Sequence, residues 1–304
     1  MKKIIVVGSA NTDMVVKSGK LPLPGETLLG GSFFMNAGGK GANQAVAAAR
    51  LGGNVTLVAK VGNDIFGKQT IEGLQKENIN IDYVFVDETA PSGTALIMVD
   101  DEGENCIVVA PGANGSLLPA DIEKVKIIAD AEIILMQLEI PVPTIEAVLN
   151  IAKQNHQRVI INPAPAQELD NELLDGLFLI TPNETEVFSL IGITVDDQAS
   201  ASVAATLLLG KGVQNVAITM GSRGAYFQNE ITSFMTPAPM VKAMDTTAAG
   251  DTFSGALAVA ITENMDWENA IKFAVEAASV SVTRIGAQSS LPYRNEIIHS
   301  LLSG

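Results

Sequence analysis

The sequence is poor in the side chains that most often carry out enzymatic chemistry. Its 304 residues include one cysteine, Cys106, and two histidines, His156 and His299. One cysteine cannot form a disulfide within the chain, and two distant histidines predict neither a zinc site nor a Ser-His-Asp or Cys-His catalytic group. We expect both histidines at the surface and a cytoplasmic location. The chemistry must then come from carboxylates, amides, lysine, backbone N–H groups and bound ions.

Basic residues and long apolar runs are scarce as well. Lys and Arg total 19 against 34 Asp and Glu, so the net charge is −15. Nucleic acids and anionic membrane surfaces attract positively charged proteins, so we expect neither as a partner. The longest uncharged stretch, residues 105–120, is interrupted by Pro111 and Pro119 and does not read as a membrane span. The apolar run at residues 4–7 stops at Gly8, too early for a signal peptide, and predicts a buried first strand.

Short apolar runs alternate with segments of helical periodicity along most of the chain. The runs that predict buried strands are residues 4–7, 55–61, 133–136, 159–161, 178–181 and 216–219. Helical spacing is found at residues 40–50, 65–77, 143–155, 184–191, 199–209, 252–263 and 267–283. Such alternation is typical of parallel strands joined by crossover helices. The predicted fold class is α/β, a three-layer α/β/α sandwich with a mostly parallel central sheet.

Two segments interrupt this alternation. Residues 15–34 place prolines and glycines around short apolar pieces, and residues 84–109 contain a predicted strand pair around a polar turn. We interpret both as parts of a small β-sheet lid, inserted at about 13–36 and 84–110 into one domain of residues 1–304. Such a lid can close over a substrate and exclude water. Hairpins without a function are the alternative.

The strongest local signal for a site is the segment 244–255, in which small residues lead into an apolar helix near Asp251. The start of a helix offers unpaired N–H groups and a partial positive charge, which suit a phosphate. The glycine and alanines ahead of Asp251 leave room for a ligand near the backbone. A carboxylate beside such a helix start suits phosphoryl transfer to a hydroxyl, whereas an isolated Asp in this place can simply cap the helix.

Other polar or glycine-rich turns follow predicted strands or begin predicted helices. The segment 36–44 contains Gly-Gly-Lys-Gly but lacks the spacing of a Walker A loop. The remaining turns are residues 8–13, 137–139, 181–186 and 219–224. Ligands of open α/β sheets bind at the carboxyl ends of the strands, so we expect these turns to form one site.

Together these segments resemble the signatures of the ribokinase family of carbohydrate kinases (the PfkB superfamily). The signature-like segments are Gly-Gly-Lys-Gly-Ala-Asn-Gln at 38–44, Asn-Glu-Thr-Glu at 183–186 and Asp-Thr-Thr-Ala-Ala-Gly-Asp at 245–251. The ribokinase branch is favoured by Gly-Glu-Thr at 25–27, Asn-Pro-Ala-Pro-Ala at 162–166 and the segment 282–288. The resemblance covers nearly the whole chain. It implies an ATP-dependent kinase that phosphorylates D-ribose at the 5-hydroxyl.

The resemblance also implies roles for individual residues. Asp251 matches the base that takes the hydroxyl proton, and Ala248, Ala249 and Gly250 match an anion hole for the γ-phosphoryl group. The positions that match sugar-binding residues are Asn11, Asp13, Gly39, Lys40, Asn43 and Glu139, with Asp251. The positions that match the nucleotide side are Asn183, Thr219, Met220, Gly221, Ser222, Arg223 and Gly224, with Gly250.

Ions and a partner subunit are implied as well. Glu186 matches a residue near Mg²⁺, which it would contact through water. A monovalent cation such as K⁺ activates ribokinases, and the matching positions are Asp245, Thr247, Ser281, Arg284, Gly286 and Ser290. We also expect a homodimer formed through the lid, because unpaired strand edges are docking surfaces.

Alternative functions remain open at this point. Within the family these are kinases of 2-deoxyribose, fructose or a nucleoside; outside it, a catalytically silent sugar-binding protein. Asn11 favours ribose over deoxyribose, because a paired donor and acceptor suit an additional hydroxyl. The presence of Asp251, Gly250 and Glu186 argues against a silent protein. One departure from the family pattern is Val275, where ribokinases often carry a polar residue near adenine.

Overall fold

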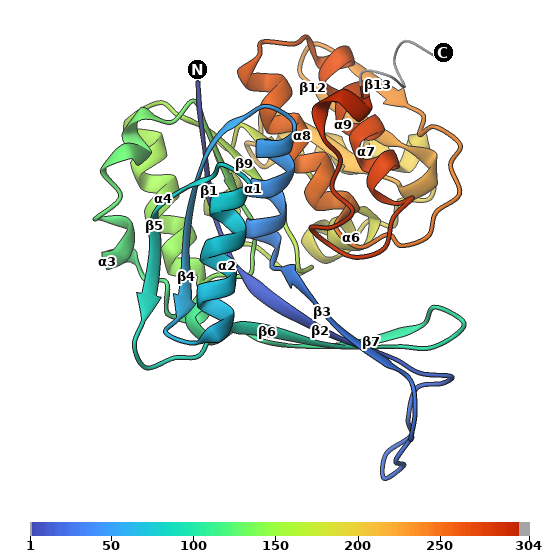
Figure 1. Ribbon diagram of the computed structural model, residues 1–304. Helices are drawn as coiled ribbons and strands as arrows, with labels where there is room; N and C mark the ends of the chain where they lie inside the picture. Colours follow the sequence, from blue (N-terminus) through green and yellow to red (C-terminus); the bar gives the residue numbers. More distant parts are fainter. Residues whose placement is uncertain (1, 298–304) are drawn as a thin grey trace.

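The computed structural model describes residues 2–297, and a nine-stranded sheet forms its centre (Figure 1). From one edge to the other the strands are β13 (Ser233–Thr236), β12 (Ala225–Asn229), β11 (Asn215–Thr219), β10 (Leu179–Ile180), β9 (Arg158–Ile161), β8 (Ile133–Met136), β1 (Lys3–Val7), β4 (Asn54–Gly62) and β5 (Asn80–Asp87). Neighbouring strands from β11 to β5 are parallel, and only the edge strands β12 and β13 pair antiparallel. The mostly parallel sheet is thus confirmed.

Helices cover both faces of this sheet. One face packs against α1 (Lys40–Arg50), α2 (Ile65–Lys76), α8 (Ala249–Thr262) and α9 (Trp267–Ser281). The other face packs against α3 (Pro119–Ile122), α4 (Val142–Gln154), α5 (Asn171–Leu174), α6 (Glu184–Ile191) and α7 (Gln198–Gly210). Along β1 the buried side chains alternate between the two cores, with Ile4 and Val6 in the first and Ile5 and Val7 in the second. A strand buried on both faces reads as a continuous apolar run, which is why the sequence revealed it.

A second, four-stranded sheet projects from the main body and forms the expected lid (Figure 1). Its strands in spatial order are β3 (Ser32–Gly38), β2 (Asn11–Lys17), β6 (Gly93–Val99) and β7 (Asn105–Ala110). The lid therefore joins two segments that are far apart in the sequence. Its strand β2 starts only four residues after β1 ends, so the lid begins directly at an edge of the central sheet.

Two parts of the sequence behave differently from the expectation. Residues 84–87 belong to β5 in the large sheet rather than to the lid, because Val84 and its neighbours pair with β4. The second lid segment accordingly begins later, at Gly93. Strands β12 and β13 were not expected, because both are short: β12 has only three buried residues in a row, and β13 has none.

The remaining expectations concern single residues and membrane spans. His156 is exposed, as expected, whereas His299 lies outside the described residues. Within residues 2–297 no helix has the length and apolarity that crossing a bilayer requires. Three short 3₁₀ helices complete the described elements: η1 (Gly112–Ser116), η2 (Lys126–Asp130) and η3 (Gly221–Arg223).

Candidate active site

The site lies where the order of strands reverses. From β1 the chain moves to β4 and β5 on one side, and it then crosses to β8 on the other side of β1. Such a switch point opens a crevice at the carboxyl ends of the two strands. Ser9, after β1, donates a hydrogen bond to the Glu139 carboxylate, which follows β8. The same carboxylate accepts the backbone N–H of Lys40 at 3.1 Å and so ties the start of α1 to the crevice.

The Gly-Gly-Lys-Gly run allows α1 to begin against the turn that follows β1. Gly39 has φ +86°, and a Cβ there would lie 2.6 Å from the backbone nitrogen of Asn11. A Cβ on Gly41 would lie 2.6 Å from the carbonyl carbon of Gly8. Only glycine tolerates both the left-handed backbone and such close approach. The motif therefore holds the polar turn of β1 next to the first turn of α1.

Asp251 lies in the first turn of α8 and is buried, with 6% of its surface exposed. Its side chain does not cap the helix, because the cap position is occupied by Ala248 in a left-handed conformation with φ 60°. Instead, Asn43 donates to its Oδ2 at 2.9 Å and Gln44 donates to its Oδ1 at 3.0 Å. Both donors come from α1, so this carboxylate is held by two fixed amides rather than by its own helix.

The helix start beside Asp251 offers free backbone donors. The first N–H groups of a helix lack intrahelical partners. Ala249 turns its N–H toward the carbonyl of Thr246 at 3.2 Å, whereas the N–H groups of Gly250 and Asp251 donate to no group among residues 2–297. The N–H of Ala248 likewise donates to no group among residues 2–297, so free donors lie at Ala248 and Gly250 of the expected span and also at Asp251. They are suited to an anion placed directly next to the Asp251 carboxylate.

Charged side chains crowd the same crevice. Burial raises the pKa of Asp13 to about 6, and the neighbouring carboxylates of Glu139 and Asp251 add to the rise. Burial has the opposite effect on the pKa of Lys40. Burial lowers its pKa, but Asp251, Glu139 and the other nearby carboxylates outweigh burial and raise it above the ordinary value. Lys40 therefore stays positively charged among acids.

Two amides complete this part of the crevice. Asn43 has a buried side-chain oxygen without a hydrogen-bond partner among the described residues. Asn114, on η1, accepts the N–H of Ala10 at 2.9 Å and donates to Oδ1 of Asn11 at 2.7 Å. Because that oxygen is engaged, Asn11 has its amide NH₂ left for a ligand. A free acceptor on Asn43 and a free donor on Asn11 suit the hydroxyl groups of a small polar molecule.

The expected nucleotide-side residues follow β10 and β11. Asn183 and Glu186 form a reciprocal cap at the start of α6: Asn183 accepts the N–H of Glu186 at 2.8 Å, and Glu186 accepts the N–H of Asn183 at 2.9 Å. Burial raises the pKa of Glu186. Thr219 is paired with Asn183 by a β-bridge, which brings the two turns together.

The turn after β11 has a glycine at each bend. Gly221 has φ 53° and Gly224 has φ 103°, and a Cβ on Gly224 would lie 1.9 Å from the carbonyl oxygen of Thr236. Met220 is buried, and Arg223 forms an ion pair with Glu184 at 2.9 Å. Ser222, between them, is exposed. The backbone of this turn therefore passes close to the end of β13 at Gly224. Without side chains, its glycines also leave main-chain groups accessible to a ligand.

Three of the six positions expected to hold a monovalent cation are joined by hydrogen bonds: Asp245, Thr247 and Gly286. Asp245 accepts the N–H of Thr247 at 2.9 Å and that of Gly286 at 2.8 Å, and so joins the turn before α8 to the loop after α9. Burial raises the pKa of Asp245, but these hydrogen bonds outweigh it and bring the pKa below its ordinary value. Ser281 and Ser290 donate to carbonyls of their own turns, and Arg284 pairs with Glu296. The Arg284 side chain thus points to an ion pair, which leaves its backbone carbonyl as the available ligand.

Comparison with known proteins agrees with the signatures. The model of the family described as "pfkB family carbohydrate kinase" matches residues 1–294. The chain belongs to the pfkB family of carbohydrate kinases. It is 42% identical to the ribokinase of Haemophilus influenzae over 301 residues, which cover 99% of this chain and 98% of that protein. It is also 39% identical to the deoxyribokinase of Salmonella typhi over 291 residues, 95% of each chain.

Solved structures of the pfkB family show the same fold. The structure of Arabidopsis thaliana ribokinase complexed with ribose and ATP superimposes with a TM-score of 0.93 at 34% identity, covering 99% of this chain and 98% of that one. The family and the fold class expected from the sequence are thereby confirmed. Val275, the departure from the pfkB pattern, is buried in the core of α9 with 4% of its surface exposed.

Sequence reasoning assigned no individual role to four buried amides of this pfkB kinase, although two of them lie in segments expected to form the site. The four are Gln44, Asn114, Gln137 and Asn162. Each makes hydrogen bonds to another polar side chain in the crevice. A signal was present, because Gln137 and Asn162 directly follow two neighbouring strands, β8 and β9. Uncharged amides at buried strand ends are candidates for ligand-site residues, since burial of such groups requires partners.

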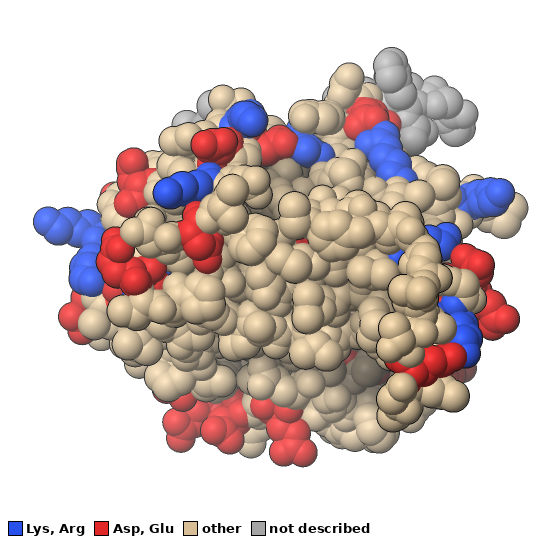
Figure 2. All heavy atoms as spheres, turned by 60° about the horizontal axis from the view of Figure 1, so that its bottom comes forward, with Lys and Arg blue, Asp and Glu red and all other residues tan. Residues whose placement is uncertain are grey.

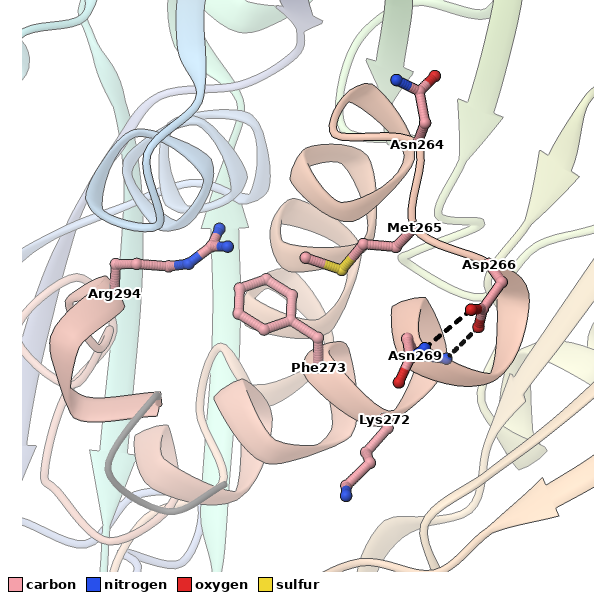
Figure 3. A pocket seen from close by; sticks show the side chains of 7 residues that line it. All are labelled: Asn264, Met265, Asp266, Asn269, Lys272, Phe273 and Arg294. Carbon is pink, nitrogen blue, oxygen red and sulfur yellow. Dashed lines mark hydrogen bonds between the residues drawn. The ribbon is translucent and has the colours of Figure 1, made fainter. Parts of the chain in front are cut away.

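A cavity of about 370 Å³ lies elsewhere, at the other end of α8 (Figure 3). It is lined by Asn264, Met265, Asp266, Asn269, Lys272, Phe273 and Arg294. Thirteen residues of helix and turn put it about 20 Å from Asp251. Asp266 caps α9 by accepting the N–H of Asn269 at 2.9 Å. The Arg294 guanidinium forms an ion pair with Glu263 at 2.8 Å and lies 4.7 Å from the centre of the Phe273 ring. These four residues thus interact with one another or with Glu263, and the crevice, where the expected site residues meet, is the candidate active site.

Proposed function

We propose that this kinase transfers the γ-phosphoryl group of ATP to the 5-hydroxyl of D-ribose. The observation that carries the proposal is the buried Asp251 carboxylate, held by two amides next to unpaired N–H groups of a helix start. Asp251 takes the hydroxyl proton, the sugar oxygen forms a bond to the γ-phosphorus, and the bond from that phosphorus to the bridging oxygen of ADP breaks. Ribose and ATP are the ligands of the Arabidopsis thaliana ribokinase structure to which this chain is similar.

The sugar would lie between the turn of β1, the start of α1 and Glu139. Asp13 and Glu139 accept hydrogen bonds from hydroxyls, and the amides of Asn11 and Asn43 add a donor and an acceptor. Lys40 offsets part of the negative charge of the carboxylates. Gly39 holds the start of α1 against the segment after β1, on which Asn11 and Asp13 lie. A sugar that leaves some of the polar groups of this site unpaired binds poorly, so the site discriminates strongly among sugars.

ATP would lie along the turns at Asn183 and residues 219–224, with its γ-phosphate against residues 248–250. Among the described residues no three acids, histidines or cysteines converge on a metal site. Both carboxylate oxygens of Glu186 already accept hydrogen bonds from Asn183. This donor set fits Mg²⁺ that is bound mainly by phosphates and waters, with Glu186 contacting a water. When bound, Mg²⁺ neutralises charge on the phosphates.

A monovalent cation, K⁺ in preference to Na⁺, would lie beside the loop that Asp245 joins to Gly286. The ionised Asp245 supplies negative charge, and carbonyls near Thr247, Ser281, Arg284 and Gly286, with Ser290, supply neutral oxygens. The hydrogen bonds of Asp245 show that this turn and loop are one unit. A cation there would hold the N–H groups at the start of α8 in place.

We also propose a homodimer formed through the lid. The register places Met35, Met14, Leu96 and Val108 in one row across the four strands, and Phe33, Val16, Met98 and Cys106 in the next row. Asp13 points to the opposite face, so these rows form the outer side of the lid. Val108 and Phe33 are 67% and 61% exposed, and Figure 2 shows a broad uncharged surface on the side from which the lid projects. A sheet with an apolar outer face requires a partner surface.

The single cysteine is compatible with a reducing compartment, and we keep the cytoplasm as the proposed location. Cys106 is exposed in β7.

The experiment that tests the function measures ADP release with a panel of pentoses, hexoses and nucleosides at fixed Mg²⁺ and K⁺. We expect the highest kcat/KM with ribose. An analogue that leaves buried polar groups of the site unpaired is disfavoured by up to about 10⁴-fold. Comparable kcat/KM for ribose and 2-deoxyribose would contradict the assignment.

A deoxyribose kinase is the second candidate, because the Salmonella typhi deoxyribokinase is nearly as similar as the ribokinases. The discriminating residue is Asn11, whose free NH₂ can donate to the 2-hydroxyl. Asn11→Ala should lower kcat/KM for ribose and leave that for 2-deoxyribose nearly unchanged. If both sugars lose activity equally, Asn11 does not read the 2-hydroxyl.

A further inference from the structure

Behind Asp251 lies a chain of buried amides that the catalytic scheme does not use. Gln44 donates from Nε2 both to Oδ1 of Asp251 and to Oδ1 of Asn162, each at 3.0 Å. Its Oε1 accepts from Nε2 of Gln137 at 2.6 Å. Gln44 and Gln137 are fully buried. The chain thus links α1 and the ends of β8 and β9 to one carboxylate.

The direction of every hydrogen bond in this chain is determined by its two ends. Asn162 donates from Nδ2 to the backbone carbonyl of Thr181 at 3.0 Å, and a carbonyl can only accept. Oδ1 of Asn162 must therefore face Gln44, which turns the NH₂ of Gln44 toward both Asn162 and Asp251. An ionised Asp251 also only accepts, so both ends require the same orientation of Gln44. Turning either amide over would bring two oxygens together.

We propose that Gln44 is a positioning residue for Asp251: its amide orients the carboxylate that accepts the sugar proton. The proposal rests on the proposed function of Asp251 as the base. Gln44 acts through Asp251 and requires no contact with the substrate. Asn43 holds the other oxygen, so the two successive residues of α1 hold one carboxylate oxygen each.

The neighbours of Gln44 support a functional role rather than a packing role. Oε1 of Gln137 is buried and has no hydrogen-bond partner among the described residues, because its NH₂ is committed to Gln44. A Cβ on Gly8 would lie 2.1 Å from that oxygen, so the glycine makes room for it. An unpaired buried acceptor is unfavourable for folding and needs an explanation. Fixing the direction of the Gln44 amide supplies one.

The decisive variant is Gln44→Glu, which keeps the length of the side chain and replaces the donor with an oxygen. That oxygen would face both Asp251 and Asn162, and two adjacent carboxylates retain a proton at higher pH than one. We expect the acid limb of the pH–kcat profile to move up by at least about one pH unit. At pH 7 kcat should fall about ten- to a hundred-fold, the range for losing one hydrogen bond to a charged group. The KM for the sugar should stay close to that of the parent.

Two further variants separate this role from simple destabilisation. Gln44→Met removes the donor without adding charge, so kcat should fall while the acid limb moves less than in Gln44→Glu. Asn215→Asp is the matched control, because Asn215 is a buried amide that donates to the Phe178 carbonyl at 2.8 Å at the opposite end of the sheet. It should lower the melting temperature and leave kcat and the pH profile unchanged.

The outcomes distinguish this proposal from the proposed function. If Gln44→Glu folds and keeps the parent acid limb, or if it does not fold and Gln44→Met keeps the parent kcat, Gln44 is only a packing residue. If instead Asp251→Asn retains the parent kcat, the assignment of the base fails, whatever Gln44 shows. Loss of activity in Asp251→Asn together with a shifted acid limb in Gln44→Glu supports both.

Discussion

Asp251 is the residue on which the proposed reaction depends most directly. In Asp251→Asn the side chain keeps its size but cannot take a proton, so kcat should fall at least about 100-fold. An amide has one oxygen where the carboxylate offers two, so either Asn43 or Gln44 loses its acceptor. The free energy of unfolding should drop by only about 1 kcal/mol.

A coupled ADP-release assay and thermal unfolding of Asp251→Asn check both values. Binding of ATP and sugar, measured by calorimetry, should stay near that of the parent and serves as the control for folding. More than about a tenth of the parent kcat would mean that the base lies elsewhere.

Asp13 predicts a dependence of sugar binding on pH. Burial raises its pKa to about 6, and only the ionised carboxylate can accept hydrogen bonds from hydroxyls at both oxygens. Lowering the pH through 6 protonates Asp13, so the KM for the sugar should rise roughly tenfold per pH unit below that value. A KM that stays constant between pH 5 and 7 would show that Asp13 does not bind the sugar as a carboxylate.

The same pKa has the opposite effect on stability. The folded pKa of about 6 exceeds the ordinary value of 3.8, so ionised Asp13 destabilises the fold, and its contribution worsens as the pH rises from about 4 to about 6. Asp13→Asn should therefore raise the free energy of unfolding above pH 7, by up to about 3 kcal/mol, while it weakens sugar binding. Urea denaturation of the parent and the variant at pH 4 and pH 8 measures this difference.

At the scale of elements, the turn before α8 and the loop after α9 act as a pair. Asp245 joins them through Thr247 and Gly286, and the left-handed Ala248 follows directly. We expect K⁺ to raise kcat more than Na⁺ at constant Mg²⁺, because a cation bound to these carbonyls steadies the N–H groups of α8. Asp245→Asn should weaken this activation. Equal turnover with and without K⁺ would count against the cation site.

Helix α1 is the second element with a decisive position. One face of a single turn carries Lys40, Asn43 and Gln44, and its start is pressed against Asn11 and Gly8 by two glycines. The sugar site and the support of the base are therefore built on one rigid helix. Local sequence explains the helix, and contacts with β1 and α8 give its side chains their partners.

At the scale of the whole molecule, the lid is expected to mediate dimerisation. Val108→Lys places a charge on the outer apolar face of the lid, which is 67% exposed at this position. We expect the parent to sediment as a dimer at micromolar concentration and the variant to shift toward monomer. Ile231→Lys, at an even more exposed apolar residue of the β12–β13 turn, is the control and should remain dimeric. A parent that sediments as a strict monomer would refute the dimer.

Much of this architecture was determined by the sequence alone. The strands β1, β4 and β8 and the helices α1, α6 and α7 could be predicted within a residue or two, because burial imposes a periodic pattern on neighbouring residues. Asp251 and the Gly-Gly-Lys-Gly run could be found for a similar reason. A helix start and a tight turn are local structures, and their requirements are written in consecutive residues.

Only the tertiary structure decided which distant residues share the site. Gln44 meets Asp251, 207 positions away, and no local pattern encodes that pairing. The raised pKa of Asp13 depends on burial and on the carboxylates of Glu139 and Asp251, which come from two other segments. Residues 84–87 were expected in the lid, but they pair with β4 and so belong to the large sheet. Hydrogen-bond direction and electrostatic coupling depend on distances in space, and only the packing of helices on the sheet sets those distances.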